Sequence, residues 1–282
     1  MKIFVYGTLL RGMLRAPVLR NSEFLGSGFI QGSFYDLGEY PGVCEGNDPI
    51  YGEIYQIDKN TLEILDQIEG YNPAAERQSL YVRKNVFVTP FDGGTPIEAI
   101  TYFYNGDTTG CNPIACGDYR RYIMENTPGD QWYLAYGTNM NQKHMINRVG
   151  TFRQAISGYV GGYHPVFNKC VVDGGVAVNI AFIKGHGCPV AAYRLMKDQL
   201  NKLDIYEGEG THYIRLGLPF SFIDKETHRT ALGHVYIAHP SMVTEYKVPS
   251  SDYLNIIRDG YLEHGFGTTE LMLQGMYPSP PW

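Results

Sequence analysis

The chain has 282 residues, of which 44% are hydrophobic and 18% are charged, an ordinary composition for a folded protein that excludes long low-complexity tracts. This length is more typical of two domains than of one. The net charge is −6, and the residues before Gly129 include 16 acidic and 10 basic side chains, against 13 of each in the rest. Because no basic cluster is present to neutralise phosphates, we expect no nucleic-acid partner.

The start of the chain and its cysteines indicate the cellular setting. The first apolar run stops at Gly7, which is too short for a signal-peptide core or a membrane span. The five cysteines lack CxxC spacing, so neither a disulfide framework nor a cysteine zinc site is indicated, and His186 has no second metal ligand at a useful spacing. We expect a cytoplasmic protein with no membrane partner, no metal and no cofactor. The oligomeric state stays open.

The first predicted element is a strand, an apolar run that ends in Tyr6-Gly7-Thr8-Leu9. Further runs of β-branched and aromatic residues, separated by Gly, Asn, Asp and Pro, predict strands at 34–35, 52–57, 81–88 and 97–104. Apolar residues three positions apart predict a short amphipathic helix over 58–68, with Asp58 or Asn60 as its N-terminal cap. Glu69-Gly70 follows this helix directly.

The same series returns in the second half of the chain. The block Tyr136-Gly137-Thr138-Asn139 follows the first such block by 130 positions, and the segment 203–208 follows 65–70 by 138. Two strand tyrosines, Tyr213 and Tyr236, return 132 and 134 positions after their counterparts in the first half. Offsets that change only by loop-sized amounts indicate the duplication of a whole domain.

This duplication determines the expected organisation. Pro128-Gly129 is a strong turn signal, so we place the linker near 125–130 and the two domains at 1–128 and 129–282. Further helices are predicted at 140–149, after a cap at Asp198, and at 252–263. The predicted fold class is α+β, with two tandem domains that are each a small mixed β-barrel with a few flanking helices.

Both copies resemble the γ-glutamylcyclotransferases, a family that includes the AIG2-like plant proteins and the γ-glutamylamine cyclotransferases. The first copy, with Gly52-Glu53-Ile54-Tyr55 after its opening turn, is more similar to the γ-glutamylamine branch. The second copy, whose opening turn ends in Asn139, is more similar to the glutathione-cycle enzymes. The resemblance implies an acyltransferase- or lyase-type enzyme that cyclises a γ-glutamyl amide to 5-oxoproline, releasing an amine or amino acid without a cofactor.

The resemblance also implies the site residues. Glu69 and Glu207 stand at the position of the family's acid/base glutamate. The implied substrate-binding residues belong to the opening turns and the strand tyrosines: Tyr6, Gly7, Thr8, Leu9, Tyr81 and Tyr102 in the first copy, and Tyr136, Gly137, Thr138, Asn139, Tyr213 and Tyr236 in the second. Tyr81 follows its glutamate by twelve positions and Tyr213 by six, so the first copy has a longer lip and a different selectivity is expected.

A single carboxylate suits this chemistry. The α-amine of a γ-glutamyl amide is already attached to the carbonyl that it attacks, so the protein only has to orient it and move a proton to the leaving nitrogen. An ordinary glutamate pKa of about 4.3, against about 8 for an α-ammonium, leaves about 5 kcal/mol of uphill proton transfer. We therefore expect burial to raise the pKa of the glutamates. Amides of a turn that contains glycine are expected to bind the α-carboxylate or the developing oxyanion.

Simpler interpretations stay open for each residue type. A glutamate at a helix end is more often a solvated surface residue, and strand tyrosines often only pack. Asp66 and Asp204 are expected to accept hydrogen bonds within a helix or turn. All eight histidines follow residue 140, so a Ser–His or Cys–His hydrolase is impossible in the first copy, whereas the carboxylate mechanism is available in both.

The amine portion of the substrate is also open: an amino acid, a polyamine, a protein lysine or a modified nucleobase. The alternative function is a non-catalytic protein that binds or sequesters a small metabolite in the same pockets.

Overall fold

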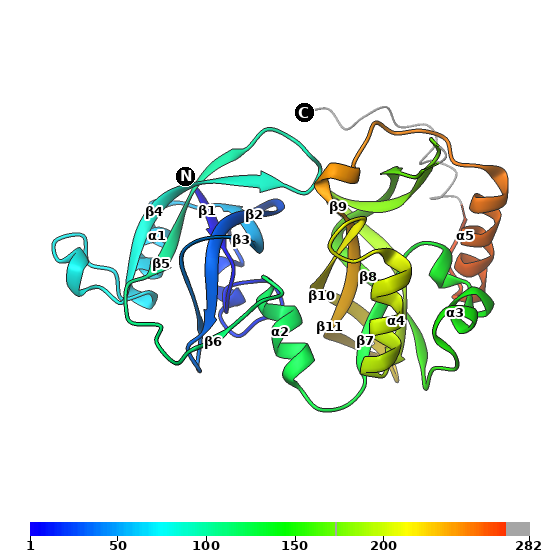
Figure 1. Ribbon diagram of the computed structural model, residues 1–282, viewed down its shortest axis with the longest axis horizontal. Helices are drawn as coiled ribbons and strands as arrows, with labels where there is room; N and C mark the ends of the chain where they lie inside the picture. Colours follow the sequence, from blue (N-terminus) through cyan, green and yellow to red (C-terminus); the bar gives the residue numbers. More distant parts are fainter. Residues whose placement is uncertain (173, 269–282) are drawn as a thin grey trace. The chain divides into compact units, whose positions relative to one another are not determined.

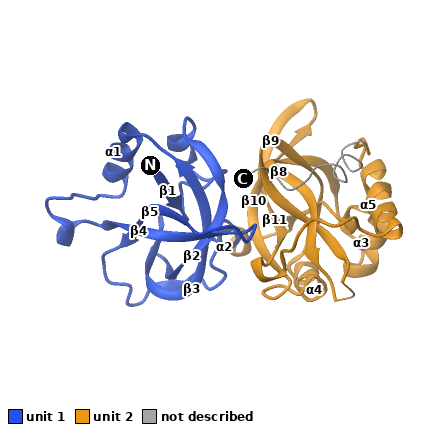
Figure 2. Cartoon of the chain, turned by 90° about the horizontal axis from the view of Figure 1, so that it is seen from above, with its two compact units in different colours: residues 1–123 blue, residues 124–282 orange. Residues whose placement is uncertain are grey.

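The computed structural model describes residues 1–172 and 174–268, and the chain forms two compact units, Met1–Ile123 and Met124–Trp282 (Figure 2). Both units have the predicted α+β fold class. The division falls inside helix α2 (Tyr119–Asn126), which the sequence pattern does not predict. Within the described ranges, no helix has both the length and the apolar character needed to cross a membrane.

The first unit is built on six strands (Figure 1): β1 (Lys2–Val5), β2 (Glu23–Asp36), β3 (Pro41–Gln56), β4 (Tyr81–Pro90), β5 (Ile97–Tyr104) and β6 (Asn112–Pro113). Their order is β3-β1-β5-β4-β2-β6, and β3 also pairs with β2. This pairing closes five strands into a small barrel, with β6 added beside β2. The barrel is mixed, because β1 and β5 run parallel whereas the other pairs run antiparallel.

The second unit repeats this topology with β7 (Gln131–Ala135), β8 (Ala155–Cys170), β9 (Val176–Leu195), β10 (Tyr213–Asp224) and β11 (Thr227–Ala238). These strands form a closed barrel in the order β10-β11-β7-β9-β8, again with one parallel pair, β7 with β11. Strand for strand, β7 to β11 take the places of β1 to β5. The predicted duplication is therefore visible as one barrel topology used twice.

The predicted helices are present, with small differences at their starts. Helix α1 (Lys59–Ile68) begins as predicted, because the Asp58 carboxylate accepts the N–H of Thr61 at 2.7 Å. Helix α3 (Gln142–Val149) begins two residues later than predicted, because Asn141 caps it and Thr138–Met140 forms a separate 3₁₀ turn. Helix α5 (Ser251–Glu263) follows a cap at Ser250.

The prediction that Asp198 caps the remaining helix is wrong. Helix α4 (Lys197–Glu207) begins after Met196, whose N–H donates to Oε1 of Gln199 at 3.0 Å. Asp198 instead lies in the first turn, 3.9 Å from the ammonium of Lys202. An acidic residue in the first turn still interacts favourably with the helix dipole, so the start of the helix is stabilised in a different way.

A buried ion cluster lies in the core of the first unit. The carboxylate of Glu53 has no exposed surface and accepts from Arg11 Nε at 3.0 Å, from Arg120 Nη1 at 2.8 Å and from the Tyr55 hydroxyl at 2.8 Å. Burial alone would raise the pKa of Glu53, but the two guanidinium groups lower it to about 2. The equivalent position in β9 holds a small apolar residue, Ala191, as the strand registers show.

Candidate active site

The opening turns of the two copies have the same internal geometry. The N–H of Leu10 donates to the carbonyl of Gly7 at 3.0 Å, and the N–H of Met140 donates to that of Gly137 at 2.9 Å. Each turn follows the first strand of its barrel and lines a pocket. The turn residues that the sequence assigns to ligand binding therefore lie in equivalent places.

The tyrosines of these turns fasten the first and last strands of each barrel together. The Tyr6 hydroxyl donates to the carbonyl of Tyr102 at 2.5 Å, and the Tyr136 hydroxyl donates to that of Tyr236 at 2.5 Å. Both hydroxyls are buried, and burial raises the pKa of each far above its usual value. A raised pKa keeps these tyrosines neutral, as donors to the strand carbonyls.

The glycine of each turn is required by a close approach. A Cβ on Gly7 would lie 2.7 Å from Cγ of Pro41, and one on Gly137 would lie 2.5 Å from Cγ1 of Val178. Neither glycine has a positive φ, so the close approach, and not a left-handed backbone conformation, is what requires glycine here. Glycine lets the start of β3 or β9 pass directly over the turn and form one wall of the pocket.

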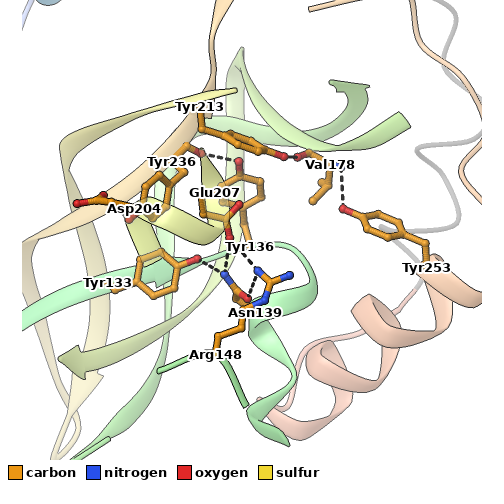
Figure 3. A network of polar contacts seen from close by, with 10 residues as sticks. All are labelled: Tyr133, Tyr136, Asn139, Arg148, Val178, Asp204, Glu207, Tyr213, Tyr236 and Tyr253. Carbon is orange, nitrogen blue, oxygen red and sulfur yellow. Dashed lines mark hydrogen bonds and ion pairs between the residues drawn. The ribbon is translucent and has the colours of Figure 1, made fainter. Parts of the chain in front are cut away.

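Glu207, the last residue of α4, sits at the centre of the second copy (Figure 3). Its Oε1 accepts from Asn139 Nδ2 at 2.9 Å and from Arg148 Nη1 at 2.9 Å. Burial raises the pKa of Glu207, while Arg148 and the Asn139 hydrogen bond lower it. Only 15% of the side chain is exposed, so the carboxylate belongs to the pocket and not to the surface.

Glu69 occupies the equivalent place at the end of α1 but has different neighbours. Burial raises the pKa of Glu69 to about 7, and Arg15 is the cation that lowers it. The turn residue that corresponds to Asn139 is Leu9, which has no polar group to offer the carboxylate. The two opening turns therefore differ at a position that lines the same pocket as the glutamate, Leu9 in the first copy and Asn139 in the second.

Asp66 and Asp204 bind strand side chains instead of the helix or turn groups that we expected. Tyr236 donates its hydroxyl to Asp204 at 2.7 Å, and Arg215 Nε lies 2.8 Å from the same carboxylate. Tyr102 donates to Asp66 in the first copy, also at 2.7 Å, and Arg83 completes that pair. Each aspartate comes three residues before its glutamate, so these contacts fasten the glutamate-bearing end of the helix to the barrel.

The remaining strand tyrosines, Tyr81 and Tyr213, also use their hydroxyls within the fold. Tyr81 donates to the carbonyl of Pro41 at 2.7 Å, and Tyr213 donates to that of Val178 at 3.1 Å. The N–H of Val178 is bound in turn by the hydroxyl of Tyr253, at 3.0 Å, from helix α5 (Figure 3). The hydroxyl protons of these tyrosines are therefore already used within the fold.

The two pockets differ greatly in size. All seven residues predicted for the second copy line a pocket of about 430 Å³, and all seven predicted for the first copy line one of about 30 Å³. Pro41 and Val178 are equivalent, because each accepts the hydroxyl of the equivalent tyrosine and covers the equivalent glycine. The residue before each is Tyr40 in the first copy and Ala177 in the second, so a large aromatic side chain lines the smaller pocket where a methyl group lines the larger one.

Comparison with known sequences identifies this arrangement. The profile of the family described as "Gamma-glutamyl cyclotransferase, AIG2-like" matches residues 3–121 and 133–255, one match in each compact unit. The chain belongs to this family.

Its relatives include single-copy proteins of the family. It is 33% identical to the "Gamma-glutamylcyclotransferase family protein YtfP" of Escherichia coli over 120 residues, which are 42% of this chain and 96% of that protein. It is 30% identical to the "Gamma-L-glutamyl-butirosin B gamma-glutamyl cyclotransferase" of Niallia circulans over 129 residues, 45% of this chain and 80% of that protein. The crystal structure of YkqA from Bacillus subtilis superposes with a TM-score of 0.75 and 22% identity over 99% of this chain and 98% of that one, a similarity of fold alone.

The structure adds residues that the family resemblance did not supply. Arg148 and Arg15 are the cations nearest the two glutamates, but they follow Tyr136 and Tyr6 by 12 and 9 positions, so no common spacing reveals them. Lys169 lines the larger pocket from β8, where the sequence showed no strand pattern. For the two arginines, the sequence offered only one signal, a basic residue soon after each Tyr-Gly-Thr.

Proposed function

We propose that the chain is a γ-glutamylcyclotransferase whose second copy cyclises a γ-glutamyl amide to 5-oxoproline, with Glu207 as the proton carrier. The observation that supports this most is a buried carboxylate of raised pKa in a pocket of about 430 Å³ that also contains the Gly137-Thr138-Asn139 turn. Pockets of this volume suit small organic ligands. The first copy has the equivalent glutamate and turn, but they line a much smaller pocket.

The reaction needs orientation and one mobile proton. The α-nitrogen of the substrate attacks its own γ-carbonyl carbon and forms the ring C–N bond, and the bond from that carbon to the amine portion breaks. The attacking nitrogen gives a proton to Glu207, which passes a proton to the leaving nitrogen and so returns to its starting state. The products are 5-oxoproline and a free amine, and the balance needs no further reactant.

Negative charge develops on the γ-carbonyl oxygen during the attack and needs hydrogen-bond donors. The backbone N–H groups of Thr138 and Asn139, with the Thr138 hydroxyl, are the proposed donors, since these residues line the pocket together with Glu207. Donors that are fixed in a turn stabilise such charge without reorganising during the reaction.

The proton affinities of the two glutamates support this role. A pKa of about 7 for Glu69 stands about one unit below that of a free α-ammonium, so the uphill cost of proton transfer falls to about 1.4 kcal/mol. Burial shifts the pKa of Glu207 in the same direction. Both shifts are the kind that a buried general base requires.

One experiment separates this function from its alternative. The purified chain is incubated with a panel of γ-glutamyl amino acids and γ-glutamyl amines, 5-oxoproline is measured by mass spectrometry, and ligand binding is measured by calorimetry. Formation of 5-oxoproline with at least one compound is expected. Binding of these compounds without 5-oxoproline would instead establish a non-catalytic binding protein, and neither binding nor turnover would exclude both functions.

We predict that Tyr40→Ala opens the first copy. A pocket of about 30 Å³ holds one or two water molecules, so Tyr40 has to be removed or displaced before a γ-glutamyl amide enters. In a chain that also carries Glu207→Gln, Tyr40→Ala should raise 5-oxoproline formation about tenfold or more, and this activity should fall as the pH drops below about 7, where Glu69 becomes protonated. No histidine precedes residue 140, so a histidine of the first copy cannot cause this pH dependence.

The matched control adds Glu69→Gln to the Tyr40→Ala, Glu207→Gln chain. It should abolish the gained activity. If Tyr40→Ala produces no gain with any γ-glutamyl amide, Tyr40 is not what closes the first copy.

A further inference from the structure

The two pockets have different chemistry on one wall. Tyr81 and Tyr213 are equivalent, but their ring faces have different neighbours. In the first copy the Tyr40 ring packs against Tyr81, with ring centroids 6.2 Å apart. In the second copy the ammonium of Lys169 lies 5.1 Å from the centre of the Tyr213 ring. The same wall is therefore aromatic in one copy and cationic in the other.

This exchange follows from the strand register. Lys169 in β8 is paired directly with Ala177 in β9, the residue that replaces Tyr40. A methyl group at 177 leaves the space into which a neighbouring long side chain extends, and Lys169 and Ala177 both line the pocket. The small side chain of Ala177 thus leaves a space in the pocket, and the ammonium of Lys169 places a positive charge in that space.

Within the described residues the Lys169 ammonium forms no salt bridge, although the charge of Glu207 in the same pocket acts to raise its pKa. Only 5% of the residue is exposed, and burial lowers its pKa. Its Nζ lies 3.1 Å from Nδ1 of His212. The one carboxylate of the pocket, Glu207, is already bound by Arg148. A buried cation without a counter-ion is costly, and an anionic ligand group beside it removes that cost.

The comparison of the copies indicates which part of the substrate Lys169 faces. Features present in both copies, the opening turn, the glutamate and the aspartate–tyrosine pair, suit the γ-glutamyl group that both would bind. The pocket wall that differs between the two copies suits the amine portion, which is the part that differs from one γ-glutamyl amide to another. We propose that Lys169, held by His212, determines specificity in the second copy by binding an anionic group, such as a carboxylate, on the amine that is released. This inference rests on the proposed function.

The test compares two substrates that differ in one charge, γ-glutamyl-alanine and γ-glutamyl-alaninamide. Both are given to the full chain carrying Glu69→Gln, so that the first copy does not contribute. The measured quantity is the ratio of kcat/KM for the acid to kcat/KM for the amide. Lys169→Met, which keeps the length of the side chain and removes its charge, should lower this ratio about tenfold to a hundredfold. Lys169→Arg should keep most of it.

Lys143→Met removes an exposed charge on α3 of the same unit and serves as the matched control, with an unchanged ratio expected. Thermal unfolding of each variant shows whether the fold is intact. If Lys169→Met slows both substrates equally and leaves the ratio unchanged, Lys169 binds the γ-glutamyl part or only supports the fold, and the inference is wrong.

Another outcome of the same experiment would show that the proposed function itself is wrong. If no variant and no parent chain forms 5-oxoproline, the cyclotransferase proposal fails. Calorimetric binding of the same two compounds then decides the inference: preferential binding of the acid that Lys169→Met abolishes supports it, and equal binding of the two compounds overturns it.

Discussion

Replacing Glu207 with glutamine should lower 5-oxoproline formation by the second copy about a hundredfold or more. A glutamine keeps the shape of the side chain, and its carbonyl still accepts hydrogen bonds from Asn139 and Arg148. It cannot accept the proton of the attacking amine. The measurement is kcat of the full chain with Glu69→Gln already present, together with calorimetric binding of the substrate, which should change far less than kcat.

The control for this variant is Glu245→Gln, which removes an exposed carboxylate of the same unit and should leave kcat unchanged. The pH profile of the parent chain gives a second readout. Because burial raises the pKa of Glu207, kcat/KM should start to fall on the acid side at a higher pH than an ordinary glutamate would produce. A Glu207→Gln chain that keeps more than about a tenth of the activity would rule out a general-base role.

Replacing Glu53 with glutamine should destabilise the first unit by about 3 kcal/mol, because a buried pair loses its anion while its cations remain. Arg120 is almost fully buried, with 3% of its side chain exposed, and Glu53 has no exposed surface. Denaturant unfolding of the full chain measures the change. The control, Glu45→Gln, breaks the exposed pair with Lys84 and should change the stability far less. Equal effects of the two substitutions would show that the buried cluster adds no net stability.

The same cluster makes the stability of the first unit depend on pH. The two arginines lower the pKa of Glu53 from 4.5 to about 2, against the opposing effect of burial. A lowered pKa gives stability that is fully present above the ordinary value of 4.5 and is lost as the pH falls toward 2. The parent chain should therefore lose stability over this range, and Glu53→Gln should lose less.

The sequence predicted β4 and β5, the ends of β2 and β3, and a glutamate at the end of one helix in each copy, because these features are local and repeated. The strand-forming runs, the Asp58 cap and the recurrence of Tyr-Gly-Thr with a helix-end glutamate all lie within short windows of sequence. The repeat supplied the internal comparison that a single sequence otherwise lacks. The fold class and the family followed from it.

What the sequence did not predict depends on contacts between distant residues. Helix α2 has only eight residues, and the burial of its Arg120 depends on the ion pair with Glu53, 67 positions earlier. Lys169 reaches the pocket only through the pairing of β8 with β9, and Tyr40 lines the other pocket because it directly precedes β3, which passes over the opening turn. These contacts join residues that are far apart in the sequence, so no spacing along the chain predicts them.

The contacts that Asp66 and Asp204 make with the barrel also restrict the motion of the helix ends that carry the glutamates. The last turn of a helix normally frays, because its carbonyls lack partners within the helix. In α4, however, Asp204 is held by Tyr236 at 2.7 Å and by Arg215 at 2.8 Å, one turn before the glutamate. The backbone that carries Glu207 is therefore ordered during folding, so an entering substrate does not have to bear that loss of conformational entropy. Amide hydrogen exchange in this final turn should consequently be slower than at the end of an unclamped helix.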